Sequence, residues 1–213
     1  MTTPNTYAAR LDIDYPPKLN RLTTFFRLLL ILPILVITWL ISATSDGQYM
    51  LDKAGNQISS ETGGIVAGLF AATALMLLFR QRYPRWWFDF SLELNRFLAR
   101  VGAYLFLLTD AYPSTVERQS VHLDIDYPDA KRDLNRWLPL VKWLLAIPHY
   151  VVLLVLAIGV LGATVIAWFA ILFTGRYPKE IFDFVVGVGR WNLRVSAYSE
   201  LLVTDEYPPF SLK

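Results

Sequence analysis

The sequence predicts an all-α integral membrane protein with four transmembrane helices, built as two tandem hairpin repeats that each end in an amphipathic interfacial helix. Three observations support this expectation. Of the 213 residues, 54% are hydrophobic and only 18% are charged, whereas about a quarter of the residues in soluble domains are charged. The apolar residues form long uncharged blocks, and a bilayer core needs about 20 helical residues to cross. The third observation is an internal duplication.

The two halves of the chain repeat each other motif by motif. Residues 11–16 (LDIDYP) return unchanged as residues 123–128. Further matches follow in the same order: Arg27 with Lys142, Pro33 with Pro148, RYP at 82–84 with 176–178, FDF at 88–90 with 182–184, Arg96 with Arg190, Arg100 with Arg194, and Tyr104 with Tyr198. Such ordered self-similarity indicates a duplicated module. It divides the chain into a first repeat, 7–116, and a second repeat, 117–213.

The first repeat carries an insertion. The offset between equivalent residues is 115 at Pro33 and Pro148 and falls to 94 at Arg82 and Arg176, so the first repeat holds 21 additional residues between these points. They fall around residues 45–64, a polar stretch rich in Gly, Ser and Asn that is typical of a loop.

Four largely uncharged segments are the expected membrane spans. In the first repeat they are residues 28–45 and 62–79, on either side of the loop. In the second repeat residues 143–175 carry no charge, and one helix of that length would be longer than the roughly 30 Å of a bilayer core. We therefore expect two spans there, 140–158 and 161–175, that meet at a tight turn near Gly159 and Gly162.

The basic residues orient these spans. Lys and Arg are enriched in cytoplasmic segments, and residues 1–27, 80–142 and 176–213 hold four, ten and five of them. The loop at 46–61 holds one, Lys53, against three acidic residues. The expected topology is therefore multi-pass, with both termini and the central linker in the cytoplasm.

An amphipathic helix is expected after each hairpin, at residues 86–108 and 179–202. Charged residues share one helical stripe in each: Asp89, Glu93, Arg96 and Arg100 in the first, and Asp183, Arg190 and Arg194 in the second. Two placements are open. The helix either crosses the membrane, giving six crossings, or lies in the cytoplasmic interface. The interface is favoured, because six crossings would turn the basic linker outward.

The LDIDYP motifs alternate apolar and acidic residues, as in residues 121–127. This period of two is typical of β-strands, so we expect short cytoplasmic strands that pair beneath the membrane.

Several motifs of the second repeat form a characteristic set: IPH at 147–149, RYP at 176–178, FDF at 182–184, Arg190-Trp191, Arg194 with Tyr198, and TDEYPPF at 204–210. Together they resemble the bacterial membrane family known as domain of unknown function 4389, and the duplication predicts two tandem copies of it. The first repeat departs from the pattern: Ile34, Leu94 and Phe97 replace His149, Val188 and Trp191, and the final Pro-Phe is missing. The resemblance implies a bacterial inner-membrane location and carries no activity.

Four arginines that recur with the module are the main candidates for binding: Arg96, Arg100, Arg190 and Arg194. Structural ion pairs within each module are one interpretation, because acidic residues recur as well: Asp89, Asp183, Asp110 and Asp205. The other interpretation is binding of anionic lipid headgroups, because guanidinium pairs bidentately with phosphate and basic sites at the cytoplasmic interface suit such lipids.

His149 is a candidate polar group inside the membrane, where such groups are often functional. It also has purely structural interpretations: a hydrogen bond to a helix carbonyl or, near the basic end of the helix, contact with interfacial water. The chain has no cysteine, and its two histidines lie too far apart in sequence to suggest a metal site, so neither a metal nor a cofactor is expected. Nucleophile triads and phosphate-binding loops are lacking.

The function expected from these features is that of a non-enzymatic inner-membrane scaffold or accessory protein. It would bind anionic phospholipid, a membrane protein partner or a second copy of itself through the amphipathic helices, and no nucleic acid. An oligomeric channel or small transporter is an alternative, since tandem repeats occur in transporters. A lipid-modifying enzyme that uses His149 is a further alternative.

Overall fold

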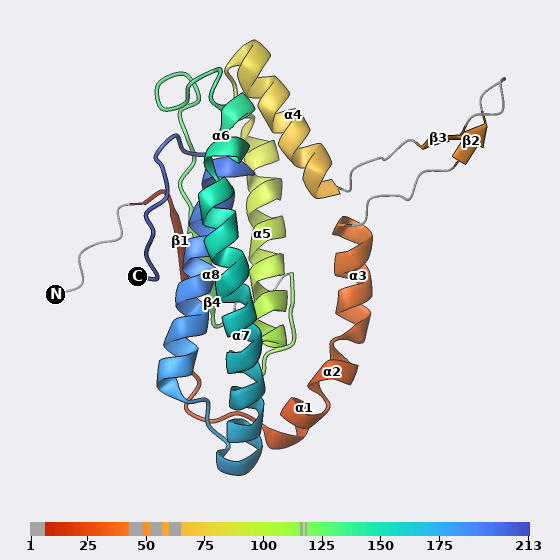
Figure 1. Cartoon of the computed structure of the whole chain (residues 1–213), viewed down its shortest axis with the longest axis vertical. Coiled ribbons are helices and arrows are strands. Elements are labelled where there is room, and N and C mark those ends of the chain that lie inside the picture. The colour runs from red at the N-terminus through yellow and green to blue at the C-terminus, as the bar shows by residue number, and fades with distance from the viewer. Residues whose placement is uncertain (1–6, 43–48, 52–56, 60–64, 116, 118) are drawn as a thin grey trace.

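The computed structural model describes residues 7–42, 49–51, 57–59, 65–115, 117 and 119–213. These residues form an elongated bundle of helices with a two-stranded β-ribbon along one side (Figure 1). The helices are α1 (Arg21–Phe25), α2 (Arg27–Leu30), α3 (Leu32–Ser42), α4 (Ile65–Arg80), α5 (Arg85–Leu105), α6 (Pro139–Leu145), α7 (Ile147–Thr174) and α8 (Lys179–Ser199). The strands are β1 (Ala9–Ile13), β2 (Tyr49–Leu51), β3 (Gln57–Ser59) and β4 (Val121–Ile125).

The two LDIDYP segments pair as antiparallel strands, with Leu11 of β1 opposite Leu123 of β4 at the centre of the register. We call this pair the ribbon. Alternate residues of β4 are buried and exposed, as its sequence period predicts, and the buried side faces the helices. The ribbon joins the two repeats, since one strand comes from each: β1 packs on α8 and β4 packs on α5.

Helices α5 and α8 occupy the positions expected for the two amphipathic helices. Each starts directly after the proline of an RYP motif, which sits in extended conformation as the N-cap. Left-handed residues recur at equivalent positions of the two repeats, with φ of 64° at Leu107 and 57° at Leu202 just beyond these helices. Since this conformation is unfavourable for a leucine, its recurrence points to one shared way of ending the helix.

The expected four transmembrane helices are wrong. Among the described residues, only α7 is long and apolar enough to cross a membrane. The predicted turn near Gly159 and Gly162 does not exist, because α7 continues through both as one helix of 28 residues. Glycine lowers helix stability by about 1 kcal/mol but keeps its backbone hydrogen bonds. At Gly159 the helix packs beside the ring of Phe184, which a Cβ would meet in ordinary van der Waals contact at 3.4 Å.

The insertion in the first repeat explains why the hairpin prediction failed. By the offsets of the duplication, α3 corresponds to residues 147–157 and α4 to residues 159–174. The inserted residues therefore interrupt the counterpart of a single long helix and do not connect two membrane crossings. With 11 and 16 residues, α3 and α4 fall short of the about 20 that a span requires. Figure 1 shows them one after the other along the long axis, on the side away from the ribbon.

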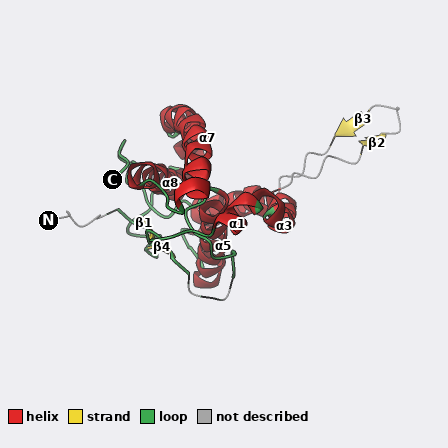
Figure 2. Ribbon diagram, turned by 90° about the horizontal axis from the view of Figure 1, so that it is seen from below, coloured by secondary structure: helices red, strands yellow, loops and turns green. Residues whose placement is uncertain are grey.

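Viewed along the long axis, the ribbon lies on one side of α5 and α8, and α3 and α7 lie away from it (Figure 2). Helix α7 packs directly on α8. The main core cluster combines buried residues of α7 and α8 such as Ile171 and Val186 with Ile13 of the ribbon. The two repeats thus share one core.

Candidate functional site

Two of the four repeated arginines hold the ribbon. The Nε of Arg190 on α8 donates to the carbonyl oxygen of Leu11 at 2.9 Å, and its Nη2 lies 2.7 Å from Asp12. Arg96 on α5 does the same to β4, with 2.8 Å to the Leu123 carbonyl oxygen and 2.7 Å to Asp124. Each guanidinium therefore reaches from its own repeat to the strand of the other.

The other two arginines hold irregular segments of the chain. Arg100 donates to the carbonyl oxygen of Ser114, and Arg194 donates to that of Ser211 near the C-terminus. Arg194 is buried, and this burial lowers the pKa of its guanidinium. The guanidinium groups of all four arginines thus donate hydrogen bonds to other residues of the protein.

The four repeated aspartates also lie in ion pairs, but with other partners. Asp89 and Asp183 form exposed pairs one helical turn from Arg85 and Lys179. The remaining two pair with buried cations: Asp110 with Arg27 at 2.6 Å and Asp205 with Lys142 at 2.7 Å.

The two buried cations are equivalent in the duplication and occupy equivalent sites. Lys142 donates to the Thr204 carbonyl oxygen at 2.7 Å and lies over the Tyr198 ring. Arg27 makes the matching contacts in the first repeat, to the Thr109 carbonyl oxygen and the Tyr104 ring. Burial lowers the pKa of Lys142, and its hydrogen bond to Asp205 acts in the opposite direction. In the sequence, these two sites could have been found from the match of Arg27 with Lys142 in the duplication.

His149 lies in an aromatic box and not against a carbonyl oxygen. Its Nδ1 accepts a hydrogen bond from Trp191 Nε1 at 3.0 Å, and its ring stacks on Phe210 at 3.9 Å. Among the described residues Nε2 has no partner. In the first repeat Ile34 stands in place of His149 and Phe97 in place of Trp191, and the counterpart of Phe210 is missing. The residues at which the second repeat differs from the first therefore pack against one another. The sequence alone did not show that they are in contact.

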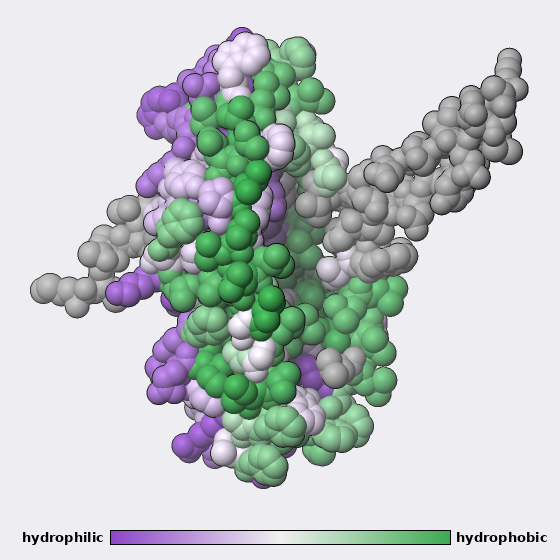
Figure 3. All heavy atoms as spheres, viewed as in Figure 1, coloured by the Kyte–Doolittle hydropathy of each residue, from purple (hydrophilic) through white to green (hydrophobic). Residues whose placement is uncertain are grey.

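A large apolar surface runs the length of the molecule opposite the ribbon. Only 17% of the most apolar stretch of α7 is buried, so most of the apolar side chains of this helix are exposed. Its exposed large side chains are Ile147, Tyr150, Val151, Leu154, Val155, Ile158, Leu161, Val165, Ile166, Phe169 and Phe173. We call these, with the exposed large apolar side chains of α1, α2, α3 and α6, the apolar face. Figure 3 shows it as a continuous green surface, with hydrophilic residues gathered toward the opposite edge.

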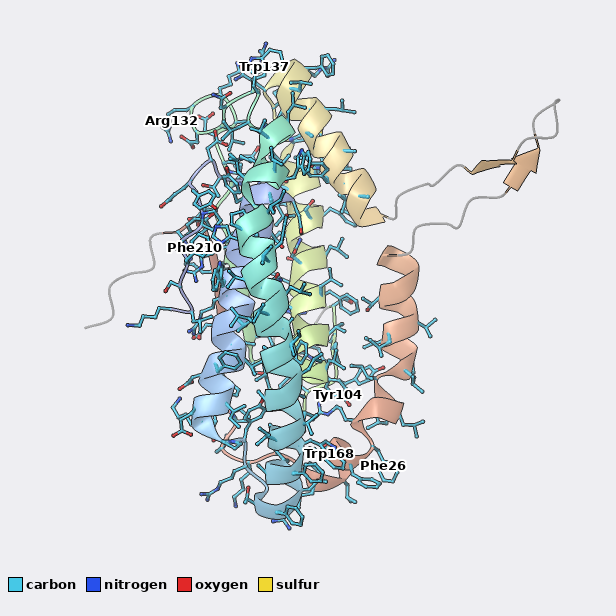
Figure 4. The ribbon with its side chains drawn as sticks, viewed as in Figure 1. Phe26, Tyr104, Arg132, Trp137, Trp168 and Phe210 are labelled. Atoms are coloured by element: carbon cyan, nitrogen blue, oxygen red, sulfur yellow. The ribbon has the colours of Figure 1, made fainter. Side chains whose placement is uncertain are left out.

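Aromatic contacts make the apolar face continuous at one end. Trp168 of α7 donates from Nε1 to the Thr24 carbonyl oxygen at 3.1 Å, and its ring stacks on Phe25 of α1. Figure 4 shows Trp168 and Phe26 close together at this end and Trp137 at the opposite end. Tryptophan is favoured at membrane–water boundaries.

Exposed arginines border the apolar face at both ends. Arg21 precedes exposed Leu22, and Arg136 precedes exposed Trp137. These two arginines are equivalent in the duplication, as are exposed Arg82 and Arg176. One member of each pair lies at each end, and we call the four the rim arginines. Within the described part of the chain none of the four makes an ion pair, in contrast to Arg96 and Arg190. No group of three or more His, Asp or Glu side chains there is suited to a metal ion.

Comparison with known proteins finds one family model that matches part of the second repeat. The family model described as domain of unknown function (DUF4389) matches residues 137–211. This match supports the expected family for the second repeat, and it contains one copy, not the two expected. The chain matches no curated protein and no solved structure.

Proposed function

We propose that the protein is a non-enzymatic scaffold or accessory protein of the bacterial inner membrane that lies on the bilayer by its apolar face. The observation that carries this proposal is the row of exposed apolar side chains along α7. Each such side chain gains about 1.5–3 kcal/mol when it leaves water. Soluble monomers rarely expose a contiguous apolar patch of this size, so a row of such side chains on one helix favours contact with lipid.

The packing of α7 favours an orientation in the membrane plane over a crossing. Helix α7 lies along α8, which carries the ribbon on its other side. If α7 crossed the bilayer, the exposed carboxylates of Asp12 and Asp124 would lie at membrane depth with the open edges of a two-stranded sheet. Charged groups and unpaired strand edges are costly in hydrocarbon. In the plane, the apolar face meets lipid and the ribbon meets water.

The charge distribution supports an anionic bilayer as the target. The rim arginines end the apolar face on both sides and are free of ion pairs within the described part of the chain. Basic residues next to an inserted apolar surface gain about 1 kcal/mol each from anionic headgroups. Arg96, Arg100, Arg190 and Arg194 hold the ribbon and the irregular segments. They would then support lipid binding only indirectly, by stabilising the fold that presents the apolar face.

On this proposal the cytoplasm is the side that the ribbon faces, as the excess of basic residues predicts. The exposed surface of the ribbon, with Arg10, Asp12, Asp14, Asp124 and Asp126, is then free for a membrane protein partner or a second copy. Vesicle flotation tests the lipid part. The purified chain should float with vesicles that contain phosphatidylglycerol, and float less with pure phosphatidylcholine or at high salt. Absence of the chain from both lipid fractions would overturn the proposal.

A further inference from the structure

Helices α5 and α8 do not close on each other, and a cavity of about 550 Å³ lies between them. The centre of the ribbon, Leu11 and Leu123, closes it on one side, and Leu153 and Val160 of α7 form another wall. This volume is within the range of about 300–1,000 Å³ that is usual for small-molecule sites.

Small residues keep the cavity open. Ala99 and Gly102 of α5 and Gly189 of α8 line it, where larger side chains would fill it. A Cβ placed on Gly102 would meet no atom within 4 Å, so the space beside this residue is empty. The bundle leaves this volume unfilled although protein interiors are otherwise close-packed.

The cavity has polar groups in its middle and at one end. Asn95 lies at the middle of α5, Asn192 and Ser196 lie in the last half of α8, and Glu200 directly follows α8. Because α5 and α8 run in opposite directions (Figure 1), Asn95 lies beside the middle of α8, and Glu200 marks one end of the cavity. The other end, with Phe106, Val185 and Val186, is apolar.

These polar groups are available to a ligand. The Asn95 amide donates to the Ser91 carbonyl oxygen at 2.8 Å, which leaves its own oxygen as an acceptor. Within the described part of the chain, the side chains of Asn192, Ser196 and Glu200 form neither a hydrogen bond nor an ion pair with another residue. No Lys, Arg or His lines the cavity, so an anionic headgroup would find no counter-charge there.

We infer that this cavity binds a single-chain lipid with an uncharged, hydroxyl-bearing headgroup. The acyl chain lies between α5 and α8 toward Phe106 and Val185, and the hydroxyl groups lie beside Ser196 and donate to the carboxylate of Glu200. Such a headgroup supplies hydrogen-bond donors to a carboxylate without bringing a second negative charge. This site lies between α5 and α8 and shares only Leu161 with the apolar face. It also takes a different headgroup, so its existence does not depend on the proposed membrane seating.

Native mass spectrometry of the full chain in maltoside micelles tests the inference, with 1-monooleoylglycerol and oleate as probes. Wild-type protein should form a one-to-one adduct with monooleoylglycerol and bind oleate at least about tenfold more weakly. Gly102→Leu, which fills the cavity, should weaken monooleoylglycerol binding by at least about tenfold. Gly162→Leu is the matched control, since this glycine also has open space beside it but does not line the cavity. Glu200→Gln should narrow the preference for monooleoylglycerol over oleate.

Equal binding of monooleoylglycerol by wild type, Gly102→Leu and Gly162→Leu would overturn the site, and equal binding of oleate would overturn the headgroup assignment. Circular dichroism checks the fold of each variant, and Ala99→Leu replaces Gly102→Leu if that variant does not fold. Flotation with anionic vesicles should be the same for wild type and Gly102→Leu. Loss of flotation in the wild type would count against the membrane seating and leave the cavity result standing.

Discussion

Arg190 and Leu11 lie 179 positions apart in the sequence and are joined by a hydrogen bond of 2.9 Å from guanidinium Nε to carbonyl oxygen. The equivalent bond from Arg96 to Leu123 closes the other half of the molecule. Through these two bonds each repeat holds the strand of the other. The ribbon therefore links the two repeats. It also forms the polar side of the molecule, opposite the apolar face.

Loss of the Arg190 bonds should loosen β1 from α8. We expect Arg190→Gln to lower the free energy of unfolding by about 1–3 kcal/mol, because a carbonyl oxygen and a carboxylate lose a charged donor. Thermal unfolding in detergent measures this. Arg85→Gln removes an exposed ion pair of α5 and should cost no more than about 1 kcal/mol. Equal effects of the two substitutions would contradict the assigned role of Arg190.

The buried pair of Lys142 and Asp205 should be sensitive to loss of one partner alone. Lys142→Met leaves the carboxylate without its cation, and we expect a cost of about 3 kcal/mol. The double variant Lys142→Met with Asp205→Asn should be more stable than Lys142→Met, since no uncompensated charge remains. A double-mutant cycle from chemical denaturation measures the coupling. Additive effects of the two substitutions would show that the ion pair contributes nothing.

Alkaline pH should destabilise the fold through buried tyrosines. Burial raises the pKa of Tyr83 from 10.0 to about 12, so the folded state keeps its phenol neutral where the unfolded state has lost the proton. The stability from Tyr83 is complete below pH 10 and falls as the pH rises toward 12, by about 3 kcal/mol in total. Tyr83→Phe should therefore lose less stability than wild type between pH 10 and 12. Parallel pH profiles would contradict this.

Removal of the rim arginines should weaken binding to anionic membranes. Changing Arg21, Arg82, Arg136 and Arg176 together to Gln should cost about 4 kcal/mol of binding free energy to phosphatidylglycerol vesicles, at about 1 kcal/mol each. A control variant changes basic residues away from the apolar face: Arg10, Lys131 and Arg132. Cosedimentation measures both. The proposal fails on this point if the control variant loses as much affinity as the rim variant.

Sequence patterns predicted the local elements well. The alternation of LDIDYP and the charged stripes located the ribbon, α5 and α8, because periods of 2 and 3.6 reflect which side of an element is buried. The spans were predicted wrongly because a loop in the first repeat suggested a hairpin, and an uncharged run does not reveal whether a helix turns or continues. Gly159 is the instructive case: its residue type is compatible with a turn, but α7 continues through it as a helix.

The partners of the repeated charges could not be predicted from spacing alone. Asp205 and Arg194 recur together in the duplication, but the fold brings Asp205 to Lys142 and Arg194 to Ser211. These contacts depend on how the repeats interlock, which is a property of the tertiary packing. The aromatic box around His149 was visible only as separate differences between the repeats.

The depth of α7 in the bilayer shows whether this helix lies in the membrane plane or crosses the membrane. Because the chain has no cysteine, single substitutions at Val151, Ile158, Val165 and Phe173 can each carry one spin label on the exposed side of α7. Collision rates with oxygen and with a water-soluble nickel chelate then measure the depth of each label in phosphatidylglycerol-containing vesicles. Seating in the plane predicts nearly equal, shallow depths at all four positions, with a label at Asp124 in water. Deep labels at Ile158 and Val165 between shallow labels at Val151 and Phe173 would show that α7 crosses the membrane and would contradict the account.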